Sequence, residues 1–227
     1  GGASIESYSQ IGHGGRSTNG ANTGNILVRA AGNFGLYGGN NNRTFAQVGH
    51  GGYDSDGNHT GNILISAGSG NLFTSLSNTK GAAGGWFDDM GDFDKDSLAD
   101  EWLFAPLSGK FSLIGGNSGL GDHTSATVGH GGYASNGNFS GDIGVSSFGD
   151  IELISGNSTR AYTQIGHGGH NQDTTLNLAG AVHVISETGD ILVRAGTGFE
   201  AYSLIGHGDD RDNNTANSRG TRQGRIH

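Results

Sequence analysis

Apolar and polar residues alternate along most of the chain in short runs bounded by glycine, asparagine, aspartate and serine. Alternation with a period of two, carried by β-branched residues, predicts β-strands, and the bounding residues predict turns. No stretch has the period of an amphipathic helix. The sequence therefore predicts an all-β protein.

The strand-like runs form three recurring words. The first word contains Gly-His-Gly and occurs five times, as YSQIGHGG (8–15), FAQVGHGG (45–52), SATVGHGG (125–132), YTQIGHGG (162–169) and YSLIGHG (202–208). The second word follows a polar loop, as GNILVRA (24–30), GNILISA (61–67), GDIGVSS (141–147) and GAVHVIS (180–186). The third word follows almost at once, as GDIELIS (149–155) and GDILVRA (189–195), with looser copies at 33–39 and 70–76.

The spacing of the first word sets the repeat length. Its histidines are His13, His50, His130, His167 and His207, so successive copies are 37, 80, 37 and 40 residues apart. We interpret the interval of 80 as two repeats, one of them enlarged, with a degenerate first word at AAGGWF (82–87). Internal repeats of this length are typical of solenoids.

Three short strands per repeat, joined by glycine-containing corners, make a coil whose inward residues are buried only by the coils above and below. The sequence predicts a parallel β-helix, or β-solenoid, of about six coils of 37–40 residues with three short strands each. Two shorter coils per repeat is the alternative. We expect residues 1–208 to form a single β-helix domain, and 209–227 to be a polar tail or the start of a further coil.

Alternation also assigns the faces of the strands. In the second and third words the β-branched and leucine positions, such as Ile63, Ile65, Ile151 and Leu153, are expected to point inward. In the first word the inward residues are Ile11, Val48, Val128, Ile165 and Ile205. The aromatic and glutamine positions are expected on the outer face, where stacking would align them as ladders: Tyr8, Phe45, Tyr162, Tyr202, Gln10, Gln47 and Gln164.

The repeated histidine allows a structural and a functional interpretation. As a structural ladder, His13, His50, His130, His167 and His207 would each bond the carbonyls of their own corner through one ring nitrogen and those of the next coil through the other. Metal binding and proton sensing are the alternatives, but each repeat places one imidazole there and no carboxylate at a fixed offset. We predict the ladder, with acid loosening it, and expect the histidines at 59, 123, 170, 183 and 227 in loops or on the surface.

The enlarged repeat contains an acidic segment unlike the rest of the chain. Asp92, Asp94, Asp96 and Asp100 alternate with other residues, with Leu98 between the last two. Carboxylates at alternate positions of a tight loop, together with a backbone carbonyl, suit calcium, which takes six to eight oxygen ligands. We place this segment, an enlarged loop at about 86–101, between a first and a second word. A solvated acidic loop without metal is the alternative.

The segment GDFDKDSLADEWLFAPLSGKFSLI (91–114) resembles the calcium loop of FG-GAP, integrin-type, repeats. The resemblance implies that Asp92, Asp94, Asp96 and Asp100 are side-chain ligands and that Leu98 is a carbonyl ligand. It implies calcium as a structural cofactor. The sequence departs from the family at Ser97, where the family has glycine, and at Glu101, where an aliphatic residue is usual.

Composition excludes several classes of protein. Glycine makes up 46 of the 227 residues and proline only 1, without a three-residue period, which excludes collagen. The net charge of −9 and the lack of a basic patch give no nucleic-acid footprint. No apolar run is long enough to span a bilayer, and there is no cysteine. The chain opens inside a repeat, so we expect it to be part of a longer protein.

The words GDILVRAG, GDIELISG and YTQIGHGG resemble repeats of filamentous-haemagglutinin-like bacterial exoproteins, which include large secreted adhesins. The resemblance covers nearly the whole chain outside 86–110 and the tail. It implies a right-handed β-helix, secreted or on the bacterial cell surface, that acts as a stalk, filament or matrix component and has no active site. Expected partners are cell surfaces, glycans and further copies of the protein, in a fibre or a longer solenoid.

An enzyme on the same fold is the alternative function. Polysaccharide-active enzymes gather acids and a base in one groove. Here Asp142, Asp150 and Asp190 stand at Gly-Asp corners, where aspartate stabilises turns. The nonapeptide of calcium-binding β-rolls does not occur. The sequence therefore favours a non-enzymatic protein.

Overall fold

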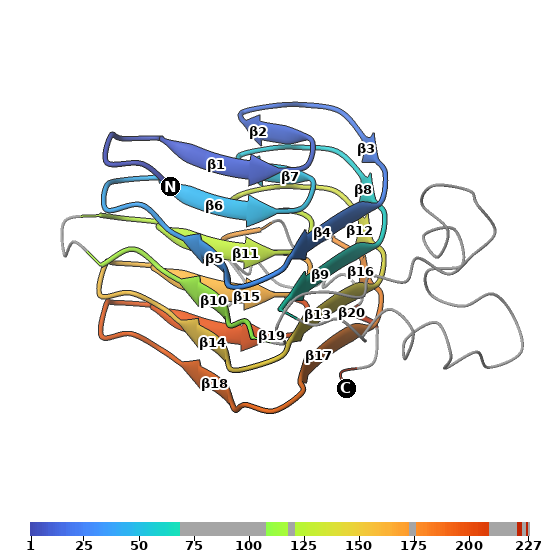
Figure 1. Cartoon of the computed structure of the whole chain (residues 1–227). Helices are drawn as coiled ribbons and strands as arrows, with labels where there is room; N and C mark the ends of the chain where they lie inside the picture. The colour runs from blue at the N-terminus through green and yellow to red at the C-terminus, as the bar shows by residue number, and fades with distance from the viewer. Residues whose placement is uncertain (69–107, 118–120, 173–175, 209–221, 224–225, 227) are drawn as a thin grey trace, which may run out of the picture.

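The computed structural model describes residues 1–68, 108–117, 121–172, 176–208, 222–223 and 226. These residues form strands β1 to β20 and no helix, and every ladder between strands is parallel. Strands of successive repeats lie on one another as stacked coils (Figure 1).

Each of the three words forms its own sheet. Sheet 1 contains the first words, in the order β1 (Tyr8–Ile11), β6 (Phe45–Val48), β11 (Ser125–Val128), β15 (Tyr162–Ile165) and β19 (Tyr202–Ile205). Sheet 2 contains the second words, β4 (Ile26–Ala30), β9 (Ile63–Ala67), β13 (Ile143–Ser147) and β17 (Val182–Ser186). Sheet 3 contains the third words, β5 (Phe34–Tyr37), β10 (Phe111–Ile114), β14 (Ile151–Ile154) and β18 (Ile191–Arg194).

The segment between sheet 1 and sheet 2 forms further short strands and is called the lobe of each coil. A lobe sheet contains β3 (Asn22–Thr23), β8 (His59–Thr60), β12 (Phe139–Ser140), β16 (Leu178–Ala179) and β20 (Arg222–Gln223). The first two coils add β2 (Gly14–Arg16) and β7 (Gly51–Tyr53). The expectation of three strands per coil is therefore incomplete, because the polar loop also pairs between coils.

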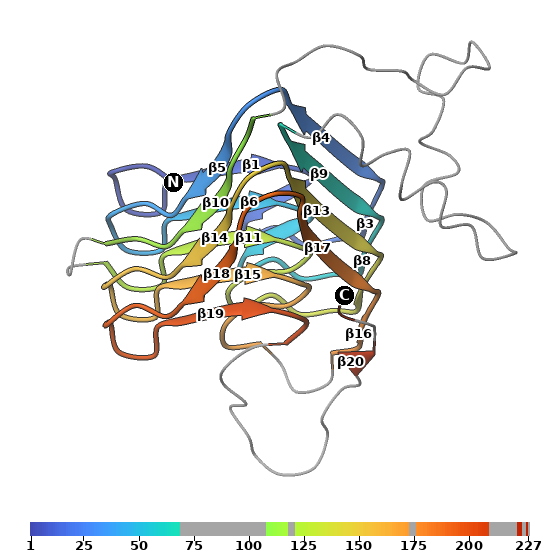
Figure 2. The ribbon, with the colours of Figure 1, turned by 60° about the horizontal axis from the view of Figure 1, so that its bottom comes forward.

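The coils form a right-handed parallel β-solenoid. In Figure 2, viewed from the C-terminal end, the chain passes from sheet 1 through the lobe sheet and sheet 2 to sheet 3 counter-clockwise while it advances toward the viewer. The register confirms one coil per repeat, because Tyr8 pairs with Phe45 and Tyr162 with Tyr202. The solenoid has about four turns, fewer than the six expected from the sequence.

The difference comes from the long interval between His50 and His130. In sheet 1, β6 pairs directly with β11, and in sheet 2, β9 pairs directly with β13. No further coil therefore lies between them, and the interval holds one coil with an insertion. The degenerate first word expected at 82–87 lies outside the described residues, and these ladders leave no position for it in the stack.

The insertion falls between sheet 2 and sheet 3. Residues 68–110 separate β9 from β10, where residues 31–33 separate the corresponding β4 and β5. The placement of the acidic loop between a first and a second word is therefore wrong. The third strand of the second coil is β10, whose Phe111 pairs with Phe34 and Ile151, and not the looser copy at 70–76.

The main core lies between the three sheets. Its members are the inward residues expected from alternation, and Val48, Ile63, Leu113, Ile143 and Leu153 are fully buried in one cluster. A second, smaller cluster fills the lobe and consists of Phe139, Leu176 and Leu178. The third and fourth coils therefore bury two compartments, and the Gly-His-Gly word lies between them.

At the C-terminal end the chain re-enters the stack after residue 221. Strand β20 pairs with β16, and Ile226 forms a bridge with Val182 of sheet 2. Residues 222–223 and 226 thus occupy the lobe and second-word positions of a further turn.

Candidate functional site

The glycines of the first word are required by close contacts between coils. Gly129 has a φ of +150°, and a Cβ atom there would overlap the carbonyl oxygen of Gly166 in the next coil. Gly49 and Gly166 meet the next coil in the same way, against Gly129 and Gly206. A positive φ together with this contact excludes any side chain.

The glutamine of the first word bonds the next coil. Nε2 of Gln47 donates to the carbonyl oxygens of Gly129 and Gly131, at 2.9 and 2.6 Å. These glycines flank His130. Gln10 and Gln164 each make the same pair of bonds to the coil that follows their own. Gln10 donates to the carbonyl oxygens of Gly49 and Gly51, and Gln164 to those of Gly206 and Gly208. The glutamine therefore fixes the Gly-His-Gly backbone of its neighbour.

The histidine bonds the preceding coil. The backbone N–H of His50 donates to Nδ1 of His130 at 3.0 Å, and Nε2 of His130 lies 2.8 Å from the carbonyl oxygen of Gly61, where the second word begins. The five imidazoles stack with centroids 4.8–5.0 Å apart and nearly parallel planes. This arrangement is called the histidine column: His13, His50, His130, His167 and His207.

These partners determine the tautomer. Because Nδ1 accepts from a backbone N–H, the proton of a neutral ring is on Nε2, which donates to the glycine carbonyl. Burial lowers the pKa of His130 to about 3, and burial and the neighbouring imidazoles of His130 and His207 lower the pKa of His167 well below its ordinary value. The interior members His130 and His167 are therefore uncharged at neutral pH.

From the second coil on, both ring nitrogens of each column histidine bond the preceding coil, at His50, His130, His167 and His207. This differs from the expected division between the histidine's own corner and the next coil. The ring thus links the end of the sheet 1 strand to the start of the sheet 2 strand in the preceding coil. These are the two ends of that coil's lobe, so the histidine holds them together. A buried imidazole with both nitrogens bonded to backbone has no lone pair for a metal or a substrate. The geometry describes a structural rung.

Two histidines expected in loops or on the surface are buried. His59 is fully buried in the lobe, where its ring stacks on Phe139 at 5.3 Å, and burial lowers its pKa to about 4. His170 is also buried, with its ring 5.7 Å from that of Tyr133. His59 departs from the expectation because it lies in β8 and the lobe has a compact interior of its own, whereas His170 lies in a loop, as expected, but is buried.

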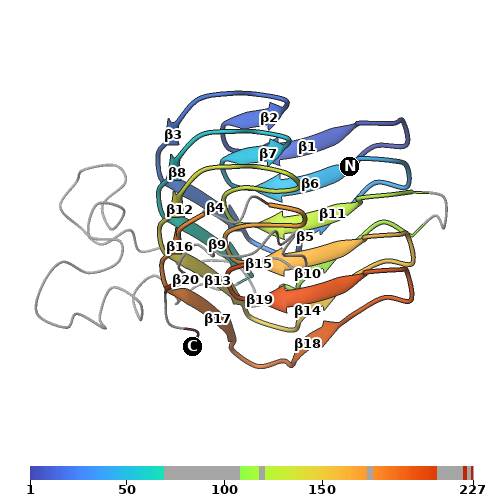
Figure 3. The same ribbon diagram turned by 180° about the vertical axis from the view of Figure 1, so that it is seen from behind.

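The lobe also covers the outer face of sheet 1. Tyr8 stacks on Phe45 at 4.9 Å and Tyr162 on Tyr202 at 5.0 Å, so the aromatic side chains do align as ladders. Phe45 and Tyr162 are nevertheless buried, since Gly52, Tyr53, Gly132 and Tyr133 of the lobes close over them. Figure 3 shows the lobes beside the strands of sheet 1. The outer face is therefore an interior surface.

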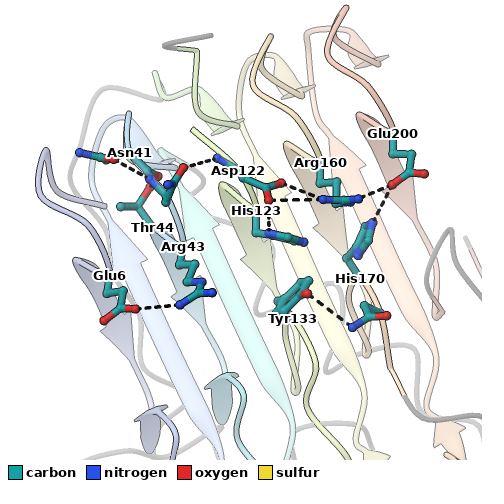
Figure 4. Close-up of polar contacts among 12 residues, drawn as sticks. Glu6, Asn41, Arg43, Thr44, Asp122, His123, Tyr133, Arg160, His170 and Glu200 are labelled. Carbon is teal, nitrogen blue, oxygen red and sulfur yellow. Dashed lines mark hydrogen bonds and ion pairs between the residues drawn. The ribbon is translucent and has the colours of Figure 1, made fainter. Parts of the chain in front are cut away.

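A column of charged side chains lies where the chain enters sheet 1. The residue two positions before each strand has a φ between +53° and +64°, in the left-handed region. These residues form the corner column, Glu6, Arg43, His123, Arg160 and Glu200, which crosses successive coils in Figure 4. Non-glycine residues rarely adopt this conformation, so its recurrence shows that the corner is a strained position in every coil.

A second column faces it from the lobes. The lobe column consists of Arg16, Tyr53, Tyr133 and His170, with Tyr53 and Tyr133 stacked at 4.6 Å. The columns meet coil by coil. Glu6 pairs with Arg16 at 2.7 Å, the guanidinium of Arg43 lies 5.9 Å from the centre of the Tyr53 ring, and His123 contacts Tyr133 edge-on at 3.9 Å. These contacts fasten the lobes over sheet 1.

Ion pairs link the corner column along the solenoid. Glu6 also receives Nη1 of Arg43 at 3.1 Å, and Nε of Arg160 donates to Glu200 at 2.9 Å. Asp122, one position before the column, receives Arg160 at 3.2 Å and lies 3.1 Å from Nδ1 of His123. Partly exposed pairs of this kind contribute about 0–1 kcal/mol each, so they select the register of the coils more than they stabilise them.

A pocket of about 330 Å³ opens between the two columns in the second and third coils. Its described lining consists of Ile5, Asn42, Arg43, Tyr53, Asp122, His123 and Tyr133. Burial raises the pKa of Tyr53 to about 12, so its hydroxyl stays protonated.

The repeated corner aspartates have structural partners. Oδ1 of Asp142 accepts the backbone N–H of Ala181 at 2.8 Å, and Oδ1 of Asp150 accepts that of Asp190 at 3.0 Å. Asn25 and Asn62 make the same bond at equivalent corners. These side chains accept N–H groups at the equivalent corner of the following coil, so their bonds join coils.

The expected calcium ligands Asp92, Asp94, Asp96, Leu98 and Asp100 lie outside the described residues. Within the ranges that the structure describes, no group of three or more histidine, aspartate or glutamate side chains is placed to hold a metal ion. The calcium site therefore stays a prediction.

Sequence reasoning missed the corner column. Its signal is present, because the columns repeat at the same intervals as the histidines. The side chains are of different types, however, and only the common backbone conformation shows that they are equivalent.

Comparison of the chain with protein-family models, with curated proteins and with solved structures finds no match. Among the described residues there is no helix long and apolar enough to cross a membrane.

Proposed function

We propose that this protein is a non-enzymatic structural and adhesive solenoid, secreted or held at a bacterial cell surface, which forms part of a stalk, filament or matrix. The proposal rests on one observation. The two end coils expose strand edges and apolar side chains whose equivalents are buried in the interior coils. This is the surface that continuation of the stack would cover.

Sheet 3 gives the clearest comparison. Ile151 and Leu153 of β14 are fully buried, whereas the equivalent Ile191 and Val193 of β18 are 45% and 43% exposed. At the opposite end, Tyr8 and Ile11 of β1 are 47% and 44% exposed, whereas Phe45 and Val48 beneath them are 5% and 0% exposed. Open parallel edges with apolar side chains pair readily with further strands.

The remaining features support a mechanical role. Contacts between coils use both ring nitrogens of the buried histidines, the regularly spaced glycines and the corner side chains. The side chains that recur in each repeat therefore hold a rigid rod together. The lobes and the corner column are the surfaces that such a rod presents along its length. Adhesion would use these surfaces, and further copies of the protein would meet the ends.

Sedimentation velocity over a range of concentrations tests the assembly directly. The intact chain is expected to form elongated oligomers as concentration rises. Val193→Lys, which places a charge on the exposed edge of β18, is expected to shift the distribution toward monomer. Ser112→Lys is the matched control, because Ser112 points outward from β10 in an interior coil. Monomer alone at the highest concentration, or equal effects of the two variants, would count against the proposal.

A further inference from the structure

The pocket between the corner and lobe columns has an electrostatic polarity. On one side, Arg16 and Arg43 share a single carboxylate, that of Glu6. Nη2 of Arg16 takes the shorter contact, at 2.7 Å, and Arg43 uses only Nη1. The side chain of Arg43 is 49% exposed and lines the pocket. Among the described residues, the two guanidinium groups on this side therefore share one carboxylate.

The other side of the pocket is acidic. Asp122 lines it, with its side chain 40% exposed, although it also contacts Arg160 and His123. Carboxylate oxygens have room for several donors, so hydroxyl groups can add to these contacts. Ile5, 59% exposed, supplies an apolar wall. Figure 4 shows Arg43 and Asp122 on neighbouring coils of the same surface.

A ligand for this pocket needs a carboxylate at one end and hydroxyl groups at the other. The guanidinium of arginine is a planar fork of donors that fits a carboxylate with two parallel hydrogen bonds. A carboxylate such as Asp122 accepts hydroxyl hydrogens. The volume of about 330 Å³ is at the lower end of the range for ligand pockets and suits one small ring.

We infer that the pocket lined by Arg43, Asp122 and Ile5 binds a sugar acid, a residue of an acidic polysaccharide, with its carboxylate on Arg43 and its hydroxyls toward Asp122. This inference deepens the proposed function and rests on it, because it identifies the class of glycan that the rod would hold. It makes the pocket a binding site without catalysis.

The stacked tyrosines do not offer a sugar platform, which narrows the chemistry further. The two rings face each other at 4.6 Å, Arg16 lies over Tyr53, and Tyr133 contacts His123 and His170. Recognition by stacking on an open aromatic face is therefore weak here, and selectivity must come from charge and hydrogen bonds. A neutral sugar would leave Arg43 without a new partner.

Isothermal titration calorimetry with a galacturonic acid trisaccharide and its methyl ester tests the inference. The measurement uses the full chain at a concentration where it is monomeric. The acid is expected to bind, more weakly as salt is added, and the uncharged ester is expected to bind at least about tenfold more weakly. Arg43→Gln should cause a loss of the same order, and Arg43→Lys a smaller one.

Arg194→Gln is the matched control. Arg194 lies exposed on β18 of sheet 3 and does not line the pocket. Arg194→Gln should leave affinity within about twofold. No binding of the acid, equal binding of acid and ester, or equal losses in the two glutamine variants would overturn the inference. Sedimentation of the same samples reports assembly separately, so a failure here leaves the rod proposal standing.

Discussion

The backbone N–H of His130 donates a hydrogen bond to Nδ1 of His167 at 3.0 Å. The same bond joins each neighbouring pair in the histidine column, and the other ring nitrogen reaches the carbonyl that opens the second word of the preceding coil. A repeated histidine between glycines is thus used for its shape and its two opposite hydrogen-bonding nitrogens. Burial lowers the pKa of His50, His130, His167 and His207.

The first prediction concerns pH. His50, His130, His167 and His207 all have a lowered pKa, with burial as the main cause. Below the ordinary histidine pKa of about 6.5, these histidines are protonated in the unfolded chain but stay neutral in the folded protein. Stability should be level above pH 7 and fall as pH drops below about 6.5, by up to about 1.4 kcal/mol per pH unit for each buried histidine.

The loss should continue until the folded pKa is reached, about 3 for His130. Thermal melts between pH 8 and 4.5 check this, and the interval from 6.5 to 5 is the most informative because most carboxylates remain ionised there. A melting temperature that does not change across the range would contradict the buried, neutral column.

The second prediction concerns a single rung. His130→Ala removes a buried ring and leaves the N–H of His50 and the carbonyl of Gly61 without partners, so it should cost about 3 kcal/mol or more of unfolding free energy. His13→Ala is the control, because His13 lies exposed in the first coil. Chemical denaturation measures both variants, and a cost for His13→Ala as large as that for His130→Ala would be inconsistent with the column.

The third prediction separates backbone strain from contact between coils. Gly129→Ala places a Cβ atom against the carbonyl of Gly166, so the coils would have to move apart, and we expect the largest loss of any single substitution considered, above about 4 kcal/mol. Gly20 also has a positive φ, +135°, but a Cβ atom there meets nothing within 4 Å. Gly20→Ala should therefore show the conformational cost alone, about 1–2 kcal/mol. Thermal unfolding of equal severity in the two variants would rule out this explanation.

The fourth prediction concerns the insertion. Gly68 and Gly109 lie against each other at its base, so residues 69–107 can be replaced by a short glycine–asparagine linker. The shortened chain should keep the β-sheet circular dichroism of the intact protein, because the ladders from β9 to β13 and from β5 to β10 do not involve the insertion.

Calcium up to millimolar concentration should raise the melting temperature of the intact chain and leave that of the shortened chain unchanged. Binding of an ion to the folded state alone stabilises it by mass action. An unchanged melting temperature of the intact chain would contradict the predicted calcium site. An equal rise of the melting temperature in both chains would show that calcium binds outside residues 69–107.

The fold could be read from the sequence because its repeat is short and its alternation is regular. The inward positions of Ile63, Ile65 and Leu153 followed from period-two patterning, and the structure buries them. The coil count failed at the interval from His50 to His130. There the chain contains words that look like strands, and only the direct pairing of Phe45 with Ser125 shows that they add no coil.

The surface was harder to predict. The polar loops that precede the second words fold back as lobes, bury His59 and cover Phe45. The corner column recurs at the spacing of the histidines, but Glu6, Arg43 and Arg160 share a left-handed backbone and no residue type, so the spacing alone does not identify them. Long-range pairing decides how the lobes fold, and local propensity does not report it.

The central claim is that the protein acts as a stacked rod that continues beyond its two end coils. Electron microscopy of the assembled protein tests it most directly. The account predicts fibres of uniform width with a repeat of about 4.8 Å along the axis, the spacing of stacked strands. Compact particles that never associate end to end, or fibres without that axial repeat, would contradict it.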